Sequence, residues 1–144
     1  MPHAHSHHIP SPKLLSPLGR GIASLQLIKE TLTIVLLGTP LLLSRPLLLL
    51  MLLPGIVLYL FRWVMVLGAF RRRAAVVVWG FTLMDELWGW FIYMRANELP
   101  TVRQLRYLYW SYWLGFAFSI IALSEIAYRY YRDRSGLRAL LKSA

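Results

Sequence analysis

The stretch AAVVVWGFTLMDELWGWFIYM, residues Ala74–Met94, decides the fold: it is 21 residues long and carries two adjacent acids, Asp85 and Glu86, near its centre. A helix of this length spans about 30 Å, the thickness of the hydrocarbon core of a bilayer. A charged Asp at the centre of such a span costs about 3 kcal/mol on insertion scales. We therefore expect a membrane helix whose acids face protein or water, are neutralised, or have a charged partner.

The composition of the whole chain agrees with this interpretation. The 144 residues suffice for one domain, 58% of them are hydrophobic, and the mean hydropathy is +0.53, well above ordinary soluble usage. Lys and Arg number 16 against 6 Asp and Glu, a net charge of +10. Because these cations cluster between apolar runs, they indicate anionic headgroups and membrane topology, with no nucleic-acid partner. The chain has no Cys, which excludes disulfides and Cys nucleophiles.

Further apolar runs predict an all-α integral membrane protein with about four transmembrane helices, with three as the alternative. The predicted spans are residues 25–43, 47–69, 74–94 and 107–128, within a helical domain 22–128. The first two spans are expected to form a proline-broken hairpin. An irregular His- and Pro-rich tail, residues 1–21, precedes this domain, and a basic membrane-surface tail, residues 129–144, follows it.

The distribution of positive charge predicts the orientation. With four spans, the side that holds both termini carries eleven Lys and Arg, and the other side carries four. The positive-inside rule therefore places both termini on the inner side. A bacterial inner membrane and an organellar inner membrane fit this prediction equally.

The third span presents its polar residues on one helical face, on which we place Thr82, Asp85, Glu86 and Tyr93. This face could be a proton or cation site, or a structural polar group that Arg62, tyrosine hydroxyls or another subunit satisfies. We favour the structural interpretation, because no further acid is expected nearby within the membrane and no repeat symmetry is visible.

Counting along the chain predicts a partner for Arg62. Residues 71–73 mark the turn between the second and third spans, and Arg62 and Asp85 lie at depths of about 14 and 18 Å from that turn. We therefore expect Arg62 to face the third span and to pair with Asp85 or Glu86. The second acid would be protonated, or bonded to Tyr, Thr or a partner subunit.

Other residue groups are candidate contact sites. Small residues in the fourth span would let a helix of another subunit or of this chain approach closely; they are Ser111, Gly115, Ser119 and Ala122. Basic residues that flank the spans are candidate headgroup contacts; they are Arg71, Arg72, Arg73, Arg129, Arg132 and Arg134. Glu125 is expected to pair with Arg129, four residues on. The candidate metal ligands, in a tail that we expect to bind no metal, are His3, His5, His7 and His8.

Catalytic motifs are absent from the sequence, which has no Gly-rich phosphate loop, HExxH or GxSxG. The predicted spans contain no His, and hence neither the usual haem ligand nor the usual base for a serine nucleophile. We therefore expect a protein that is not an enzyme, with no cofactor held by this chain alone and with bound lipids.

The predicted function is that of a small accessory or structural subunit of a larger membrane protein complex. Its partners would be other membrane protein subunits and anionic lipids. One alternative is a small oligomeric proton- or cation-coupled transporter that uses Asp85 and Glu86. Another is a lipid-shaping hairpin protein built on residues 25–70.

Overall fold

The computed structural model describes residues 14–38, 53–68, 70–95 and 102–143. The secondary-structure elements in these ranges are all helices. The elements are α1 (Pro17–Thr33), the π-helix η1 (Ile34–Gly38), α3 (Leu53–Val66), α4 (Arg72–Arg95) and α5 (Val102–Ser143). An isolated bridge also joins Leu14 to Arg71. The all-α fold class predicted from the sequence is confirmed.

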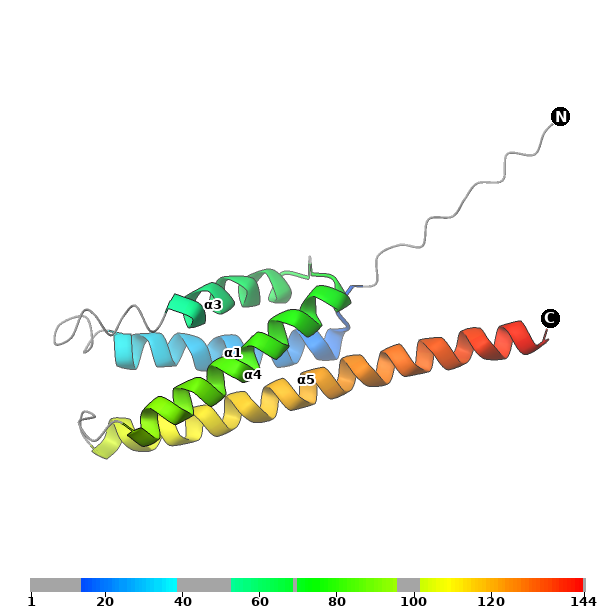
Figure 1. The fold of residues 1–144 in the computed structure, drawn as a ribbon. Coiled ribbons are helices and arrows are strands. Elements are labelled where there is room, and N and C mark those ends of the chain that lie inside the picture. Colours follow the sequence, from blue (N-terminus) through cyan, green and yellow to red (C-terminus); the bar gives the residue numbers. More distant parts are fainter. Residues whose placement is uncertain (1–13, 39–52, 69, 96–101, 144) are drawn as a thin grey trace.

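The α-helices form an antiparallel bundle in which α1 and α4 each pack on α3 and α5 (Figure 1). Contacts between helix ends establish the directions. Arg20, in the first turn of α1, donates to the carbonyl of Val66 at the end of α3. Ser16, just before α1, donates to the carboxylate of Glu125 in the second half of α5, at 2.7 Å. α1 therefore runs antiparallel to α3 and α5. Arg72, at the start of α4, pairs with Asp133 in the second half of α5 at 3.0 Å, so α4 is also antiparallel to α5.

The first helix begins earlier than the sequence prediction placed it. Ser16 is its N-cap, whose hydroxyl accepts a hydrogen bond from the amide of Gly19 at 3.0 Å, and Pro17 occupies the first helical position. Both residue types are favoured at these positions, because the serine oxygen satisfies a free amide and proline has none to satisfy. The prediction of an irregular segment through residue 21 was therefore wrong from Pro17 onwards.

The turn between α3 and α4 is tight and is fastened to α1. Gly68 has a φ of 84°, a conformation that strongly favours glycine. The guanidinium of Arg20 donates two hydrogen bonds, of 3.0 and 3.3 Å, to the carbonyl of Val66, which the end of α3 leaves without a helical partner. The connection of the predicted first hairpin, residues 39–52, lies outside the described residues.

Helix α5 is 42 residues long, which corresponds to about 63 Å. It runs through the predicted end of the fourth span at residue 128 and continues as helix to Ser143. Within the described ranges, the part of α5 from Tyr109 to Ser143 is the one helix that is long and apolar enough to cross a membrane. One such helix weakly supports a membrane protein. It does not confirm the predicted four spans.

The bundle has an apolar outside and a partly charged inside. The four α-helices in the described ranges all expose large hydrophobic side chains, among them Leu25, Phe61, Trp63, Phe81, Leu87, Trp110 and Trp113. The buried side chains include Trp79 and Met65, but also Gln26, Lys29, Arg62 and Glu86. Soluble domains usually keep such charges on the surface.

Candidate functional site

The first part of the site is a buried arginine that joins three helices. Arg62 on α3 has an exposed fraction of 0%. Its Nη2 atom donates to the carboxylate of Glu30 on α1 at 3.2 Å and to the hydroxyl of Thr82 on α4 at 2.5 Å. Its guanidinium also lies over the ring of Trp79, 4.1 Å from the centroid, in a cation–π contact. Arg62 therefore links α1, α3 and α4.

A second ion pair joins Lys29 on α1 to Glu86 on α4, and both side chains are buried. Gln26 lies between the two pairs, because its amide donates to Glu86 at 3.1 Å and to Glu30 at 2.9 Å. Removing a charge from water is costly unless a partner of opposite sign compensates it. The two cations and two of the acids therefore compensate one another inside the bundle.

Gly115 on α5 provides the space for the second ion pair. A Cβ atom at this position would overlap the carboxylate of Glu86 and the ammonium of Lys29. The predicted packing residues around it, Ser111, Ser119 and Ala122, are also buried. In this chain the small-residue face of α5 therefore lies against α1 and α4 of the same molecule.

Asp85 differs from its neighbour Glu86. It is only partly buried, and its Oδ2 atom lies 3.5 Å from the position that a Cβ of Gly55 on α3 would take. Among the described residues, none forms a hydrogen bond or an ion pair with Asp85. The carboxylate of Glu86 is therefore compensated by Lys29, whereas that of Asp85 faces α3 and has no charged partner among the described residues.

The partner predicted for Arg62 was wrong. Arg62 does face the third span, but its ion pair is with Glu30, and Glu86 pairs with Lys29. The physical reason is that α1 is one of the helices of the bundle and turns the face with Gln26, Lys29 and Glu30 towards α3 and α4. The expectation that no further acid lies near Glu86 was wrong for the same reason. The side chain of Tyr93 lies outside the described part of the chain.

The polar residues of α1 that pair with Arg62 and Glu86 follow a pattern that is visible in the sequence. Gln26, Lys29, Glu30 and Thr33 follow one another at spacings of three, one and three, and so share one helical face. This polar face fits an interfacial helix as well as a buried one, so the spacing alone does not reveal its partners.

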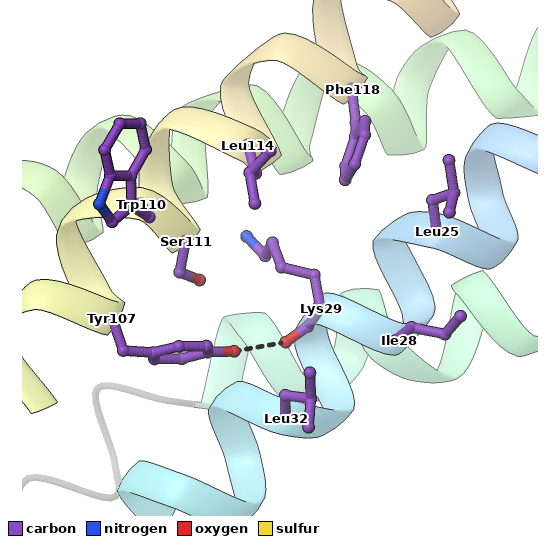
Figure 2. Close-up of a pocket in the computed structure, with 9 residues that line it drawn as sticks. All are labelled: Leu25, Ile28, Lys29, Leu32, Tyr107, Trp110, Ser111, Leu114 and Phe118. Atoms are coloured by element: carbon purple, nitrogen blue, oxygen red, sulfur yellow. Dashed lines mark hydrogen bonds between the residues drawn. The ribbon is translucent and has the colours of Figure 1, made fainter.

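A shallow apolar groove of about 280 Å³ lies between α1 and α5, beside the Lys29 side chain that pairs with Glu86 (Figure 2). Its walls include Ile28 and Leu32 on α1 and Leu114 on α5. The hydroxyl of Tyr107, at one end, donates to the backbone carbonyl of Lys29 at 3.4 Å. Lys29 and Ser111 also line the groove, and they have partners in Glu86 and Thr33. Because these three polar groups have partners within the chain, the groove presents mainly hydrocarbon to its surroundings.

The predicted headgroup contacts fall into two sets. In the first set, Arg72 pairs with Asp133 at 3.0 Å and Arg129 pairs with Glu125. The predicted pair of Glu125 with Arg129 is therefore confirmed. The exposed members are Arg71, Arg73, Arg132 and Arg134.

The predicted metal-ligand candidates, His3, His5, His7 and His8, lie outside the described residues. Within the described ranges, no three His, Cys, Asp or Glu side chains lie close enough together to hold a metal ion.

Comparison of the chain with protein families, curated proteins and solved structures finds no match. A functional proposal therefore rests on the chain's own residues.

Proposed function

We propose that this chain is a small multi-pass membrane protein that serves as an accessory, structural subunit of a larger membrane complex. The exposed hydrophobic side chains on all four α-helices support the membrane environment. A soluble monomer rarely exposes large contiguous apolar patches, whereas lipid tails and partner helices cover them readily. The proposal includes contacts with anionic lipids at Arg71 and Arg73, the exposed arginines around the start of α4.

The lengths of the helices support more than one span. α1 and η1 together contain 22 residues, and α4 contains 24, which correspond to about 33 and 36 Å. Both lengths reach the roughly 30 Å of a bilayer core. The described part of α3, 14 residues or about 21 Å, covers only part of that thickness. In this proposal all four helices cross the membrane, α3 as part of the predicted span 47–69, with both termini on the inner side as the charge distribution predicts.

The observation that carries the structural role is the internal compensation of charge. Lys29 with Glu86, and Arg62 with Glu30, connect different helices through side chains that are largely removed from solvent. Breaking such a pair leaves an uncompensated charge, so the pairs favour one arrangement of the helices over others. The outer surface of the bundle then remains available for lipids and for other subunits.

One observation favours the transporter as a second candidate. Asp85 lies next to Glu86, is partly buried, and has no hydrogen-bond or ion-pair partner among the described residues. Ionisable side chains in membrane spans often mark proton or cation pathways. In this alternative Asp85 exchanges a proton or cation while Glu86 stays paired with Lys29.

Flux through the purified protein separates the two candidates. The full-length chain is reconstituted alone into vesicles, and proton and Na⁺ movement is followed after a pH or ion jump. The structural proposal expects the same background leak for the wild type, for Asp85→Asn and for the control variant Asp133→Asn, whose carboxylate pairs with Arg72 at the surface, away from Asp85 and Glu86. Flux that Asp85→Asn abolishes and Asp133→Asn retains would establish the transporter instead.

Labelling of single cysteines tests the arrangement in the membrane. Because the chain contains no Cys, one introduced thiol reports on one position only. A membrane-impermeant maleimide should reach Ser143→Cys from the inner side and Asn97→Cys from the outer side. Labelling of both variants from the same side contradicts the four-span arrangement.

A further inference from the structure

Helix α5 continues well beyond the bundle (Figure 1). Its last buried side chain is Ile126, and the remaining 17 residues to Ser143 add about 26 Å. In this C-terminal arm, residues 127–143, every side chain is exposed except that of Arg129, which is partly buried. The pair between Asp133 and Arg72 holds the base of the arm against the start of α4.

The arm carries an apolar stripe along one side. Tyr130, Leu137 and Leu141 follow one another at spacings of seven and four, the repeat of a helix that packs along another helix. Arg134 lies on the same face, between Tyr130 and Leu137, and interrupts the apolar stripe with a positive charge. Leu140 lies beside this stripe, and Leu140 and Leu141 have exposed fractions of 69% and 70%. Nothing within the described chain covers these leucines.

The arm is also strongly basic. Its cations are Arg129, Arg132, Arg134, Arg138 and Lys142, against the single acid Asp133. Two such arms would repel each other on close approach, which disfavours a second copy of this chain as the occupant of the stripe. An acidic surface would be attracted to it and held in register.

The membrane surface is a poorer fit than a protein. A straight continuation of α5 carries Leu140 and Leu141 about 21 Å past Ile126, away from a membrane that the earlier part of the helix crosses. Lying flat on the headgroups would need a break in the helix, for which Ser135-Gly136 is the one usual kink site in the arm; α5 instead runs through this pair as continuous helix to Ser143.

We propose that the C-terminal arm docks an acidic helical segment of a partner subunit outside the membrane. Leu137, Leu140 and Leu141 pack against the apolar side of that segment, and Arg134 within the stripe and Arg138 beside it pair with its acids. This inference rests on the proposed role as a subunit of a complex, and it assigns one surface of the chain to the partner.

Photo-crosslinking in the assembled state tests the inference. A photoreactive amino acid replaces Leu137 on the stripe or, as the matched control, Ala139 on the opposite side of the same arm. After irradiation of intact membranes, the adducts of the full-length chain are identified by mass spectrometry. We expect a discrete adduct from position 137, joined to an Asp- and Glu-rich segment of another polypeptide, and at least tenfold less from position 139.

The dependence on charge is measured in the same assay. Reversing two exposed arginines, Arg134→Glu with Arg138→Glu, should lower the yield of that adduct about tenfold, whereas Arg134→Lys with Arg138→Lys should preserve it. Adducts of position 137 with lipid would instead place the arm on the membrane surface, and adducts with the same chain would make it a self-association helix. Either result overturns the inference, as do the absence of an adduct and an equal yield from position 139.

Failure of the arm and failure of the proposed function give different results. If the chain copurifies with other subunits at a fixed ratio but position 137 gives no protein adduct, only the docking surface is wrong. If the chain is isolated without any other polypeptide, the role as a subunit is wrong as well.

Discussion

A methyl group at Gly115 should destabilise the protein, although alanine is the better helix former. The added Cβ would overlap the Lys29 ammonium and the Glu86 carboxylate, which meet at the backbone of α5. Gly80 on α4 is the matched control, because a Cβ there has no neighbouring atom within 4 Å. The same substitution is therefore expected to have opposite effects at these two positions.

The expected magnitude follows from two opposing contributions. Replacing glycine with alanine inside a helix stabilises it by about 1 kcal/mol, which is the full expectation for Gly80→Ala. At Gly115 the ion pair must separate, and breaking a buried pair costs about 3–5 kcal/mol. The net result for Gly115→Ala is a loss of about 2–4 kcal/mol of unfolding free energy.

The assay is reversible unfolding of the purified chain in mixed micelles, followed by helical circular dichroism as the denaturing detergent increases. A second background carries Lys29→Ala with Glu86→Ala, which removes both charged groups and opens the space beside Gly115. In that background Gly115→Ala should cost less than about 1 kcal/mol. If Gly115→Ala were as stabilising as Gly80→Ala, or equally harmful in both backgrounds, the placement of the ion pair against α5 would be wrong.

Two further substitutions probe neighbouring contacts by the same unfolding measurement. Arg62→Leu should cost about 3–5 kcal/mol because it leaves Glu30 buried without its cation; adding Glu30→Leu should recover much of the loss, whereas adding Asp85→Leu should not. Gly89→Ala should be about 1–3 kcal/mol less stable than Gly80→Ala, because the new Cβ would lie 2.5 Å from the ring of Tyr112; if Gly89→Ala stabilises as much as Gly80→Ala, the close approach of α4 and α5 at this point is wrong.

Much of the helical fold could be predicted from runs of apolar residues. The predicted third span, residues 74–94, agrees with α4 to within two residues at each end. The predicted fourth span ended at residue 128, where the hydropathy falls, yet α5 continues to Ser143. Hydropathy marks where a helix stops being apolar; the helix itself continues because Arg, Ala and Leu favour it and no proline interrupts it.

The pairing of the charged residues could not be predicted, because it depends on which faces of separate helices meet. Arg62 and Asp85 lie at similar predicted depths, but α1 packs against α3 and places Glu30, instead of Asp85, within 3.2 Å of the Arg62 guanidinium. The small-residue pattern around Gly115 predicted a close approach. It could not show that the space beside the glycine is filled by an ion pair from two other helices.

The mass of the assembly that contains the native chain tests the central claim most directly. The full-length protein is released from its own membrane in a mild detergent and weighed intact by native mass spectrometry. A structural subunit predicts a defined mass well above the 16.7 kDa of one chain, made up of this chain and other polypeptides at a fixed ratio, with bound lipids. A mass equal to one chain, or to a whole number of copies of it with no other polypeptide, would contradict the claim.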